Sequence, residues 1–206
     1  MKLLFLKRPF DFAFSMIGLI ISSPLWFIIS IAILFEDGFP LFYPQERIGK
    51  DGRIFKAMKF RSMIKDAEKN TGPLQAAEND PRTTIVGRIL RSTAMDELPQ
   101  LVNILKGDMS FVGPRALRPS EIEVEEKTGE SVPMENIPGY YKRLKVLPGL
   151  TGIAQVYAPR DVPRRHKFKY DLLYIKKQSF LLDLKLIFLS FWITFRGKWE
   201  SRKSKF

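Results

Sequence analysis

An uncharged hydrophobic run dominates the N-terminal part of the chain. It extends from Phe12 to Phe35 and reads FAFSMIGLIISSPLWFIISIAILF. As a helix rising about 1.5 Å per residue, the run would measure about 36 Å, which exceeds a hydrocarbon layer of about 30 Å. The run is long for a secretion signal, no clear cleavage pattern closes it, and its uniformity is unusual for a buried core helix. We therefore predict that this segment lies in the membrane.

The pattern alone leaves the path of this segment through the membrane open. Pro24 cannot donate to the carbonyl of Ile20, so a kink is expected, and the hydroxyls of Ser22 and Ser23 can bond to the freed backbone groups. Basic residues flank the run on both sides, so the positive-inside rule favours neither end as cytoplasmic. These flanking residues are Lys2, Lys7, Arg8, Arg47, Lys50 and Arg53. A kinked spanning helix fits, and so does a re-entrant helix that breaks at Ser23-Pro24 and returns to the same face.

The chain after Phe39 has mixed charge and frequent Gly and Pro, which is typical of a soluble domain. Short apolar runs on either side of a Lys-Asp-Gly-Arg turn predict a small β-hairpin between residues 41–43 and 54–60. A helical stretch is predicted from 84 to 101, and Gly107 is a typical stop for a helix that ends at Lys106. These elements predict an α+β fold that is mainly helical.

Two later segments differ in charge from the rest. Residues 119–138 concentrate glutamates in an otherwise basic protein and so predict an exposed insertion. Residues 180–206 mix aromatic with basic side chains, and Asp183 and Lys185 leave too short an uncharged run to span a membrane. This mixture is typical of an amphipathic helix in the headgroup region with a basic tail. A core-packed helix with a solvated tail is the alternative.

The overall composition narrows the partners and the chemistry. The chain has 206 residues and a formal net charge of +12, which indicates an anionic partner such as nucleic acid, anionic lipid or a phosphorylated substrate. The absence of cysteine excludes disulfides, thiolate nucleophiles and iron–sulfur clusters. A single histidine excludes a multi-histidine metal cage.

The adjacent acids Asp96 and Glu97 have a structural and a chemical interpretation. As structure, Thr93 and Asp96 fit a capping pattern at the start of a helix, where acids are favoured. As chemistry, carboxylates among several basic residues beside a Gly-Pro-Arg turn can hold a divalent cation and a diphosphate together. The basic residues near in sequence are Lys59, Arg61, Arg88, Arg91 and Arg115.

Several motifs along the chain resemble those of the bacterial sugar transferases, the monotopic phosphoglycosyl transferases. They are KRPFDF, the Ser-Pro break, MKFRSM, RSTAMDELPQLVNILKGDMSFVGPR, PGLTGIAQV and KYDLLY, in that order. DELPQ followed by KGDMSFVGPR is highly specific. The resemblance covers nearly the whole chain apart from the acidic insertion and the basic tail. Ala116 and Leu147 depart from it, because many relatives have Pro and Arg at these positions.

The resemblance implies a transfer in two steps. Such enzymes move a phosphosugar from a UDP-sugar to a polyprenyl phosphate such as undecaprenyl phosphate, and they release UMP. By analogy Asp96 attacks the phosphorus and forms a covalent phosphosugar, and Glu97, together with Asp96, holds Mg²⁺. The positions that match substrate-binding residues are Lys59, Arg61, Arg91, Arg115, Gln155, Arg160 and Asp171.

The resemblance also implies where the parts of the chain lie. Residues 1–36 would form a re-entrant anchor, 37–179 a catalytic domain on the cytoplasmic face of the bacterial inner membrane, and 180–206 an interfacial helix with a basic tail. Membrane lipids are expected neighbours, and downstream glycosyltransferases are possible partners.

Two other classes of function compete with the enzyme. A nucleic-acid binder is not expected, because the one dense basic run, residues 164–169, lacks a reader motif. A non-enzymatic, membrane-anchored module with a basic lipid-binding surface would explain the charge and both membrane segments. It leaves the paired acids and clustered arginines unexplained.

Overall fold

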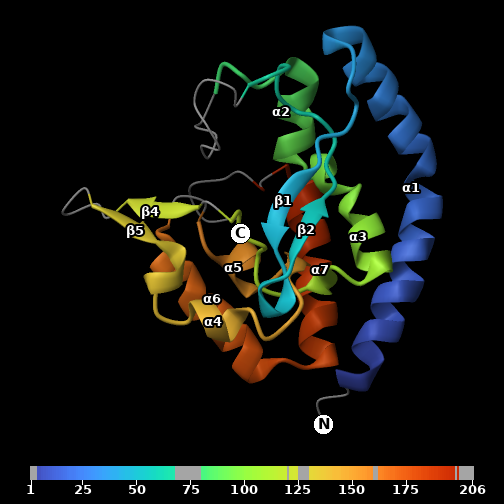
Figure 1. Cartoon of the computed structure of the whole chain (residues 1–206). Coiled ribbons are helices and arrows are strands. Elements are labelled where there is room, and N and C mark those ends of the chain that lie inside the picture. The colour runs from blue at the N-terminus through green and yellow to red at the C-terminus, as the bar shows by residue number, and fades with distance from the viewer. Residues whose placement is uncertain are drawn as a thin grey trace.

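The computed structural model describes residues 4–67, 80–119, 121–124, 130–159, 162–197 and 199. It confirms an α+β fold that is mainly helical, with a long helix along one edge and the other elements packed on its inner side (Figure 1). The helices and 3₁₀ turns of the described residues are η1 Leu4–Leu6, α1 Lys7–Asp37, η2 Lys50–Gly52, α2 Ile85–Ser92, η3 Met95–Glu97, α3 Gln100–Lys106, η4 Met134–Asn136, α4 Tyr140–Arg143, α5 Ile153–Tyr157, α6 Arg164–Lys177 and α7 Phe180–Phe195. The strands are β1 Gln45–Ile48, β2 Ile54–Ala57, β3 Ser110–Val112, β4 Ile122–Val124, β5 Ser131–Pro133 and β6 Gly149–Thr151.

Helix α1 continues through Pro24 without interruption. The hydroxyl of Ser23 donates to the carbonyl of Ile20 at 2.8 Å, which is the carbonyl that the proline leaves without its backbone donor. Ser22 donates to the carbonyl of Gly18 at 2.6 Å. The serines therefore do what the sequence predicts, but the secondary structure is not broken at Ser23-Pro24. Figure 1 shows α1 as one bowed helix.

Both ends of α1 are bonded to the same body of the protein. At its start, Arg8 donates to the last carbonyls of α3, Ile104 at 2.6 Å and Leu105 at 2.9 Å. At its end, Glu36 accepts hydrogen bonds from the backbone N–H groups of Ile85 and Val86, at 2.5 and 2.9 Å, and so caps α2. The basic residue Arg8, expected to flank a membrane segment, is thus a part of the helix packing.

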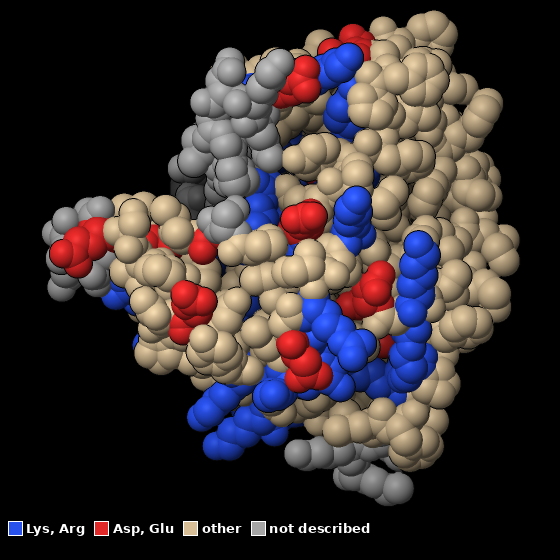
Figure 2. All heavy atoms as spheres, viewed as in Figure 1, with Lys and Arg blue, Asp and Glu red and all other residues tan. Residues whose placement is uncertain are grey.

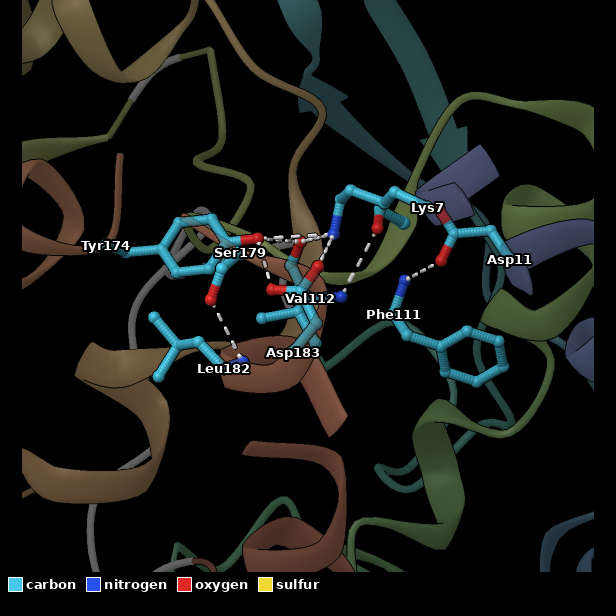
Figure 3. A network of polar contacts seen from close by, with 9 residues as sticks. Lys7, Asp11, Phe111, Val112, Tyr174, Ser179, Leu182 and Asp183 are labelled. Carbon is cyan, nitrogen blue, oxygen red and sulfur yellow. Dashed lines mark hydrogen bonds and ion pairs between the residues drawn. The ribbon is translucent and has the colours of Figure 1, made fainter. Parts of the chain in front are cut away.

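The first turns of α1 also hold the outer edge of strand β3. The ammonium of Lys7 lies 2.6 Å from the Asp183 carboxylate of α7 and 2.9 Å from the carbonyl of Val112. Tyr174 of α6 donates to the same carboxylate at 2.8 Å (Figure 3). Asp11 accepts a hydrogen bond from the backbone N–H of Phe111 at 3.1 Å. Side chains therefore take the place of a third strand along β3.

The outward side of α1 stays apolar and exposed. Phe12, Ile20, Ile21, Phe27, Ile28 and Phe35 are among its exposed side chains. With η1, the helix forms the one candidate membrane-crossing segment among the described residues, by length and composition. Along the middle of α1 the edge of the molecule shows no charged side chains in this view, whereas acidic and basic groups are interspersed over the face beside it (Figure 2).

The predicted hairpin is present with a different first strand. Strands β1 and β2 pair antiparallel from Gln45↔Ala57 to Ile48↔Ile54, around a turn in which Asp51 has a positive φ of 53°. The segment 41–43, expected to be a strand, contributes a single bridge between Phe42 and Phe60. The prediction missed β1 because its sequence, QERI, has no run of apolar residues.

A second antiparallel pair, β4 and β5, projects from the body within the acidic segment 119–138 (Figure 1). The expected exposure is wrong for its first acids. Glu121 forms an ion pair with Arg164, and Glu123 is 7% exposed and bonded to Arg165 at 3.3 Å. These pairs join the segment to the start of α6. Residues 125–129 lie outside the described part of the chain.

Helix α7 combines the two interpretations of the C-terminal segment. Leu186 and Ile193 are fully buried in a core cluster with Val156 and Tyr174. The opposite side of α7 exposes large apolar side chains, which include Leu181, Phe188, Phe191, Trp192 and Phe195. The helix is thus packed on the core along one side and suited to a membrane surface along the other. The basic tail from 201 to 206 lies outside the described residues.

Candidate active site

The Asp96–Glu97 pair lies in the short turn between α2 and α3. Helix α2 begins at a side-chain cap, because the hydroxyl of Thr84 accepts a hydrogen bond from the N–H of Gly87 at 2.9 Å. The turn η3 is tied to the hairpin, since the carbonyl of Asp96 accepts a hydrogen bond from the N–H of Phe60 at 2.9 Å. Both connections fix the backbone that carries the pair.

The capping role expected for Thr93 and Asp96 is wrong. Thr93 donates back to the carbonyls of Ile89 and Leu90 at the end of α2, at 2.8 and 3.2 Å. The residue that precedes η3 is Ala94, which has a positive φ of 55° and caps nothing with its side chain. A non-glycine residue in this conformation stores about 1 kcal/mol or more of backbone strain, typically beside a functional group.

Two basic side chains from distant elements bind Glu97. Lys59, beyond the end of β2, lies 2.6 Å from the Oε1 atom of Glu97, and Arg115, after β3, donates to the same atom at 2.9 Å. Asp96 is farther from Lys59, at 3.8 Å. The structure therefore brings together Lys59, Asp96, Glu97 and Arg115, which the sequence placed in one site.

The two carboxyl groups of the pair differ in their electrostatics. Burial raises the pKa of Asp96 to about 6, against the opposing charge of Lys59 and with the support of Glu97. Burial acts the same way on Glu97, but Arg115 and Lys59 outweigh it and hold the Glu97 pKa well below its usual range. Glu97 is thus an anion with two bound cations, whereas Asp96 carries a more basic carboxylate. Such a separation is typical of carboxyl groups with different chemical roles.

The other predicted substrate-binding residues lie at different distances from the pair. Arg91 acts on the pKa of Asp96 through its charge, in the direction opposite to burial. Gln155 is buried behind the Arg115 loop and donates to the carbonyl of Gly113 at 3.4 Å. Arg61 does not reach the pair, because it bonds to the end of α1 through Asp37 and Gly38. Arg160 lies outside the described residues.

Asp171 is also placed away from the pair. Its carboxylate on α6 is 3% exposed and lies 3.0 Å from both Nε and Nη2 of Arg143 on α4. Burial raises the pKa of Asp171, and Arg143 opposes this effect. One carboxylate oxygen of Asp171 is thus bound by a buried guanidinium, and contact with a nucleotide or a metal, the interpretation made from the sequence, stays a prediction.

Basic residues that were not predicted as site residues surround the Arg115 loop. Burial lowers the pKa of Arg47 to about 9, with the like charges of Arg115 and Arg118 adding to the effect. Arg47 also lines a small pocket beside Glu97, together with Lys59, Gln100, Arg115 and Gly149. Arg118 stands three residues after Arg115, a spacing visible in the sequence. Arg47 lies in a strand that was not predicted.

The charged pair offers few ligands for a metal ion. Among the described residues, no group of three or more His, Cys, Asp and Glu side chains could hold a metal by itself. The dyad supplies two carboxylates. That set fits Mg²⁺, which is typically bound through one or two carboxylates and completed by water and substrate phosphates.

Comparisons with known proteins agree with this site and fold. The model of the family described as bacterial sugar transferase matches residues 2–197. Exopolysaccharide production protein ExoY of Sinorhizobium fredii is 35% identical over 196 residues, which cover 88% of this chain and 82% of ExoY. Exopolysaccharide production protein PSS of Rhizobium leguminosarum bv. phaseoli is 37% identical over 190 residues, which cover 90% of this chain and 92% of PSS. The chain belongs to the bacterial sugar transferase family.

Longer relatives contain the same region as a part. The UDP-glucose:undecaprenyl-phosphate glucose-1-phosphate transferase of Klebsiella pneumoniae is 41% identical over 197 residues. The match covers 93% of this chain and 40% of the Klebsiella protein. The chain therefore spans most of the exopolysaccharide proteins and about two fifths of this longer transferase.

Proposed function

We propose that the protein transfers a sugar 1-phosphate from a UDP-sugar to undecaprenyl phosphate, and so begins the assembly of a bacterial glycan. The support is family membership together with relatives whose names specify this kind of transfer, with glucose, galactose or N-acetylgalactosamine as the sugar. The observation that carries the proposal is the unequal carboxylate pair, in which Glu97 binds Lys59 and Arg115 and leaves Asp96 as the more basic group.

In the proposed reaction Asp96 is the nucleophile. A carboxylate oxygen of Asp96 attacks the sugar-bound phosphorus of the UDP-sugar, the bond from that phosphorus to the bridging oxygen breaks, and UMP leaves with the bond's electron pair. A phosphate oxygen of undecaprenyl phosphate then attacks the same phosphorus and expels the Asp96 carboxylate. A raised pKa suits Asp96 for attack, because a more basic oxygen is the better nucleophile when it is ionised near neutral pH.

Cations near the pair reduce the repulsion between the Asp96 carboxylate and the substrate diphosphate. A carboxylate and a diphosphate repel each other, and Lys59, Arg115 and Arg47 around the pocket supply positive charge that reduces this repulsion. Mg²⁺ would be held by Glu97 and Asp96 together with the diphosphate, where it would stabilise charge on the leaving phosphate.

The membrane arrangement that we propose follows from the contacts of α1. Its first turns bind α3 and α7, and its last turn binds α2, so both ends belong to one catalytic body. A continuous helix fastened in this way would keep both of its ends on the same side of the membrane, with its exposed apolar side in the lipid. Nucleotide sugars are cytosolic, so we assign the body to the cytoplasmic face of the inner membrane. The exposed apolar side of α7 fits the same surface.

Labelling of single cysteines tests this topology, because the chain has no cysteine of its own. Cysteines that replace Lys2 and Lys50 should both react with a membrane-impermeant reagent from the cytoplasmic side of inverted vesicles, and neither should react from the outside of intact spheroplasts. Opposite accessibility of the two sites would establish a spanning helix.

The covalent step predicts a reaction that needs no lipid acceptor. Protein mixed with Mg²⁺ and a panel of UDP-glucose, UDP-galactose and UDP-N-acetylgalactosamine should release at most one UMP per active site and gain the mass of one phosphosugar. Asp96→Asn should gain no mass. Release of UMP only after undecaprenyl phosphate is added, with no adduct before it, would favour direct attack by the lipid phosphate.

The same assay separates the enzyme from the non-enzymatic alternative. A protein that binds anionic vesicles but releases no UMP from any sugar of the panel, with or without undecaprenyl phosphate, would be a lipid-binding module. Turnover with one sugar of the panel would identify the substrate at the same time.

A further inference from the structure

The loop that carries Arg115 is held at three consecutive carbonyl groups. The carbonyl of Pro114 accepts a hydrogen bond from the N–H of Gly149 at 2.9 Å. The carbonyl of Arg115 accepts one from Nη2 of Arg143 at 2.5 Å, and that of Ala116 accepts one from Nη1 of Arg47 at 2.9 Å. Two guanidinium groups from distant elements thus fix the backbone on which the Arg115 side chain turns toward Glu97.

Gly113, the residue before this loop, is packed so closely that its backbone cannot shift. A Cβ atom added to Gly113 would lie 2.3 Å from the carbonyl oxygen of Leu147, closer than any real contact. The N–H of Gly113 donates to the carbonyl of Thr151 at 2.9 Å. The backbone that enters the loop therefore packs against the β6 region, and the carbonyl of Arg115, one residue beyond that of Pro114, is the first of the three loop carbonyls that a side chain holds.

Arg143 is itself held in one orientation by two neighbours. Its guanidinium lies 4.5 Å from the centre of the Phe168 ring, and both Nε and Nη2 lie 3.0 Å from one Asp171 oxygen. The side chains of Arg143 and Asp171 are 3% and 4% exposed. A buried ion pair of this kind contributes little net stability compared with apolar side chains of the same volume. Stability alone therefore gives no reason for a guanidinium here, whereas its planar fork can bond to a carboxylate and a carbonyl at once.

We infer that Arg143 and Asp171 serve the transfer reaction as positioning residues: Asp171 orients Arg143, and Arg143 holds the backbone of Arg115 so that the Arg115 side chain stays at Glu97. The inference rests on the proposed function, in which Arg115 faces the diphosphate. It gives Asp171 a role at a distance from the substrate, through two arginines in series.

The test uses a double variant that removes both charges without leaving one of them buried. In Arg143→Met/Asp171→Leu the pair is replaced by apolar side chains of similar size, so the fold should be retained. We expect kcat for UMP release to fall about 10- to 100-fold, since a misplacement of about 1 Å can cost that much. Arg143→Lys keeps a charge for Asp171 but lacks the fork, so it should keep the melting temperature and still lose kcat.

A matched control removes a second buried carboxylate–arginine pair. Asp80 is 5% exposed and bonded to Arg82, which also donates to the carbonyl of Ala67. Arg82→Met/Asp80→Asn should change the melting temperature without the loss of kcat. Equal losses of kcat in the two double variants would mean that both pairs act on the fold only, and the inference would be overturned.

The decisive measurement is dependence on Arg115. If the pair acts through Arg115, then Arg143→Met/Asp171→Leu should cost less than about twofold in a background of Arg115→Ala. An unchanged loss in that background would overturn the inference.

A readout without substrate separates this result from the proposed function. The Nε–H resonance of Arg115 in nitrogen-15 spectra should shift in the Arg143→Met/Asp171→Leu variant and stay in place in the control. If the unaltered protein released no UMP, the proposed function would fail, and an unmoved Arg115 resonance would overturn the positioning role independently.

Discussion

Two buried ion pairs hold the two ends of one short segment, and they use it differently. Lys7 of the Lys7–Asp183 pair donates to the carbonyl of Val112, and Arg143 of the Arg143–Asp171 pair donates to the carbonyl of Arg115, three residues later. The first pair joins the long apolar helix α1 to α7, and the second joins α4 to α6. A buried ion pair that donates to a backbone carbonyl thus attaches α1 at one end of the segment. At the other end, a second such pair positions the side chain of Arg115 at the dyad.

The dyad itself contrasts with both pairs. Asp183 and Asp171 each have a cation close to them, at 2.6 and 3.0 Å. Asp96 lies 3.8 Å from Lys59, which is bound to Glu97 instead. The carboxylates of Asp183 and Asp171, which hold the fold together, are each neutralised by an adjacent cation. The charge of the proposed nucleophile is left partly uncompensated, which lowers stability and leaves the group reactive.

The largest expected effect is that of Asp96→Asn. This substitution should lower the rate of UMP release by about 10³-fold or more, and it should also stabilise the protein. The pKa of Asp96 is raised to about 6 from an unfolded value of 3.8, so ionisation of Asp96 costs folding free energy. The cost is absent below pH 4, grows between pH 4 and 6, and above pH 6 amounts to on the order of 1–3 kcal/mol. Melting temperatures of both proteins at pH 4 and pH 7.5 check the prediction, and a less stable variant at pH 7.5 would contradict it.

The next effect is structural and concerns the other pair. Among the described residues, Lys7→Met leaves the buried Asp183 carboxylate with Tyr174 as its side-chain donor and no cation, so it should destabilise the fold by about 3–5 kcal/mol. Lys7→Met/Asp183→Leu should regain most of that loss, because no buried charge is left. Chemical unfolding in detergent measures both variants.

This prediction also sharpens the comparison of the two pairs. UMP release per folded molecule of Lys7→Met/Asp183→Leu should stay well above that of Arg143→Met/Asp171→Leu. If the two double variants lose activity equally, the attachment of α1 and the positioning of Arg115 are not separate roles of the two ion pairs.

Features set by local pattern could be predicted from the sequence. The long apolar helix, the hairpin turn and the stop at Gly107 follow from hydropathy and turn residues close together in the chain. The grouping of Asp96, Glu97, Lys59 and Arg115 was also correct, because the family motifs mark those residues. Local pattern failed at Thr93, where a capping sequence is present but the left-handed Ala94 changes the direction of the backbone.

The partners of buried charges could not be predicted. Lys7 meets Asp183 across 176 positions and Arg143 meets Asp171 across 28, and neither sequence spacing specifies a contact. Lys7 and Arg8 were interpreted as charges flanking a membrane segment, a role that composition suggests equally well. Asp171 was assigned to the substrate by its motif alone, since a motif identifies a residue without its neighbours.

The smallest expected effect concerns the middle of α1, the part of the anchor farthest from either ion pair. Ser23→Ala removes the hydroxyl that donates to the carbonyl of Ile20, and Pro24 has no N–H to replace it. The loss should be about 0.5–1.5 kcal/mol, the usual value of one hydrogen bond. In a background of Pro24→Ala the backbone N–H returns to that carbonyl, so the same substitution of Ser23 should cost almost nothing.

A thermodynamic cycle of the four proteins, measured by unfolding in one detergent, isolates this coupling. Equal costs of Ser23→Ala with and without the proline would show that the serine does not act by supplying the missing donor. The difference, if found, means that α1 passes through Pro24 as one helix because a neighbouring hydroxyl completes it. The two fastened ends then bound a continuous helix, and an ion pair at its start can hold the whole anchor on the catalytic body.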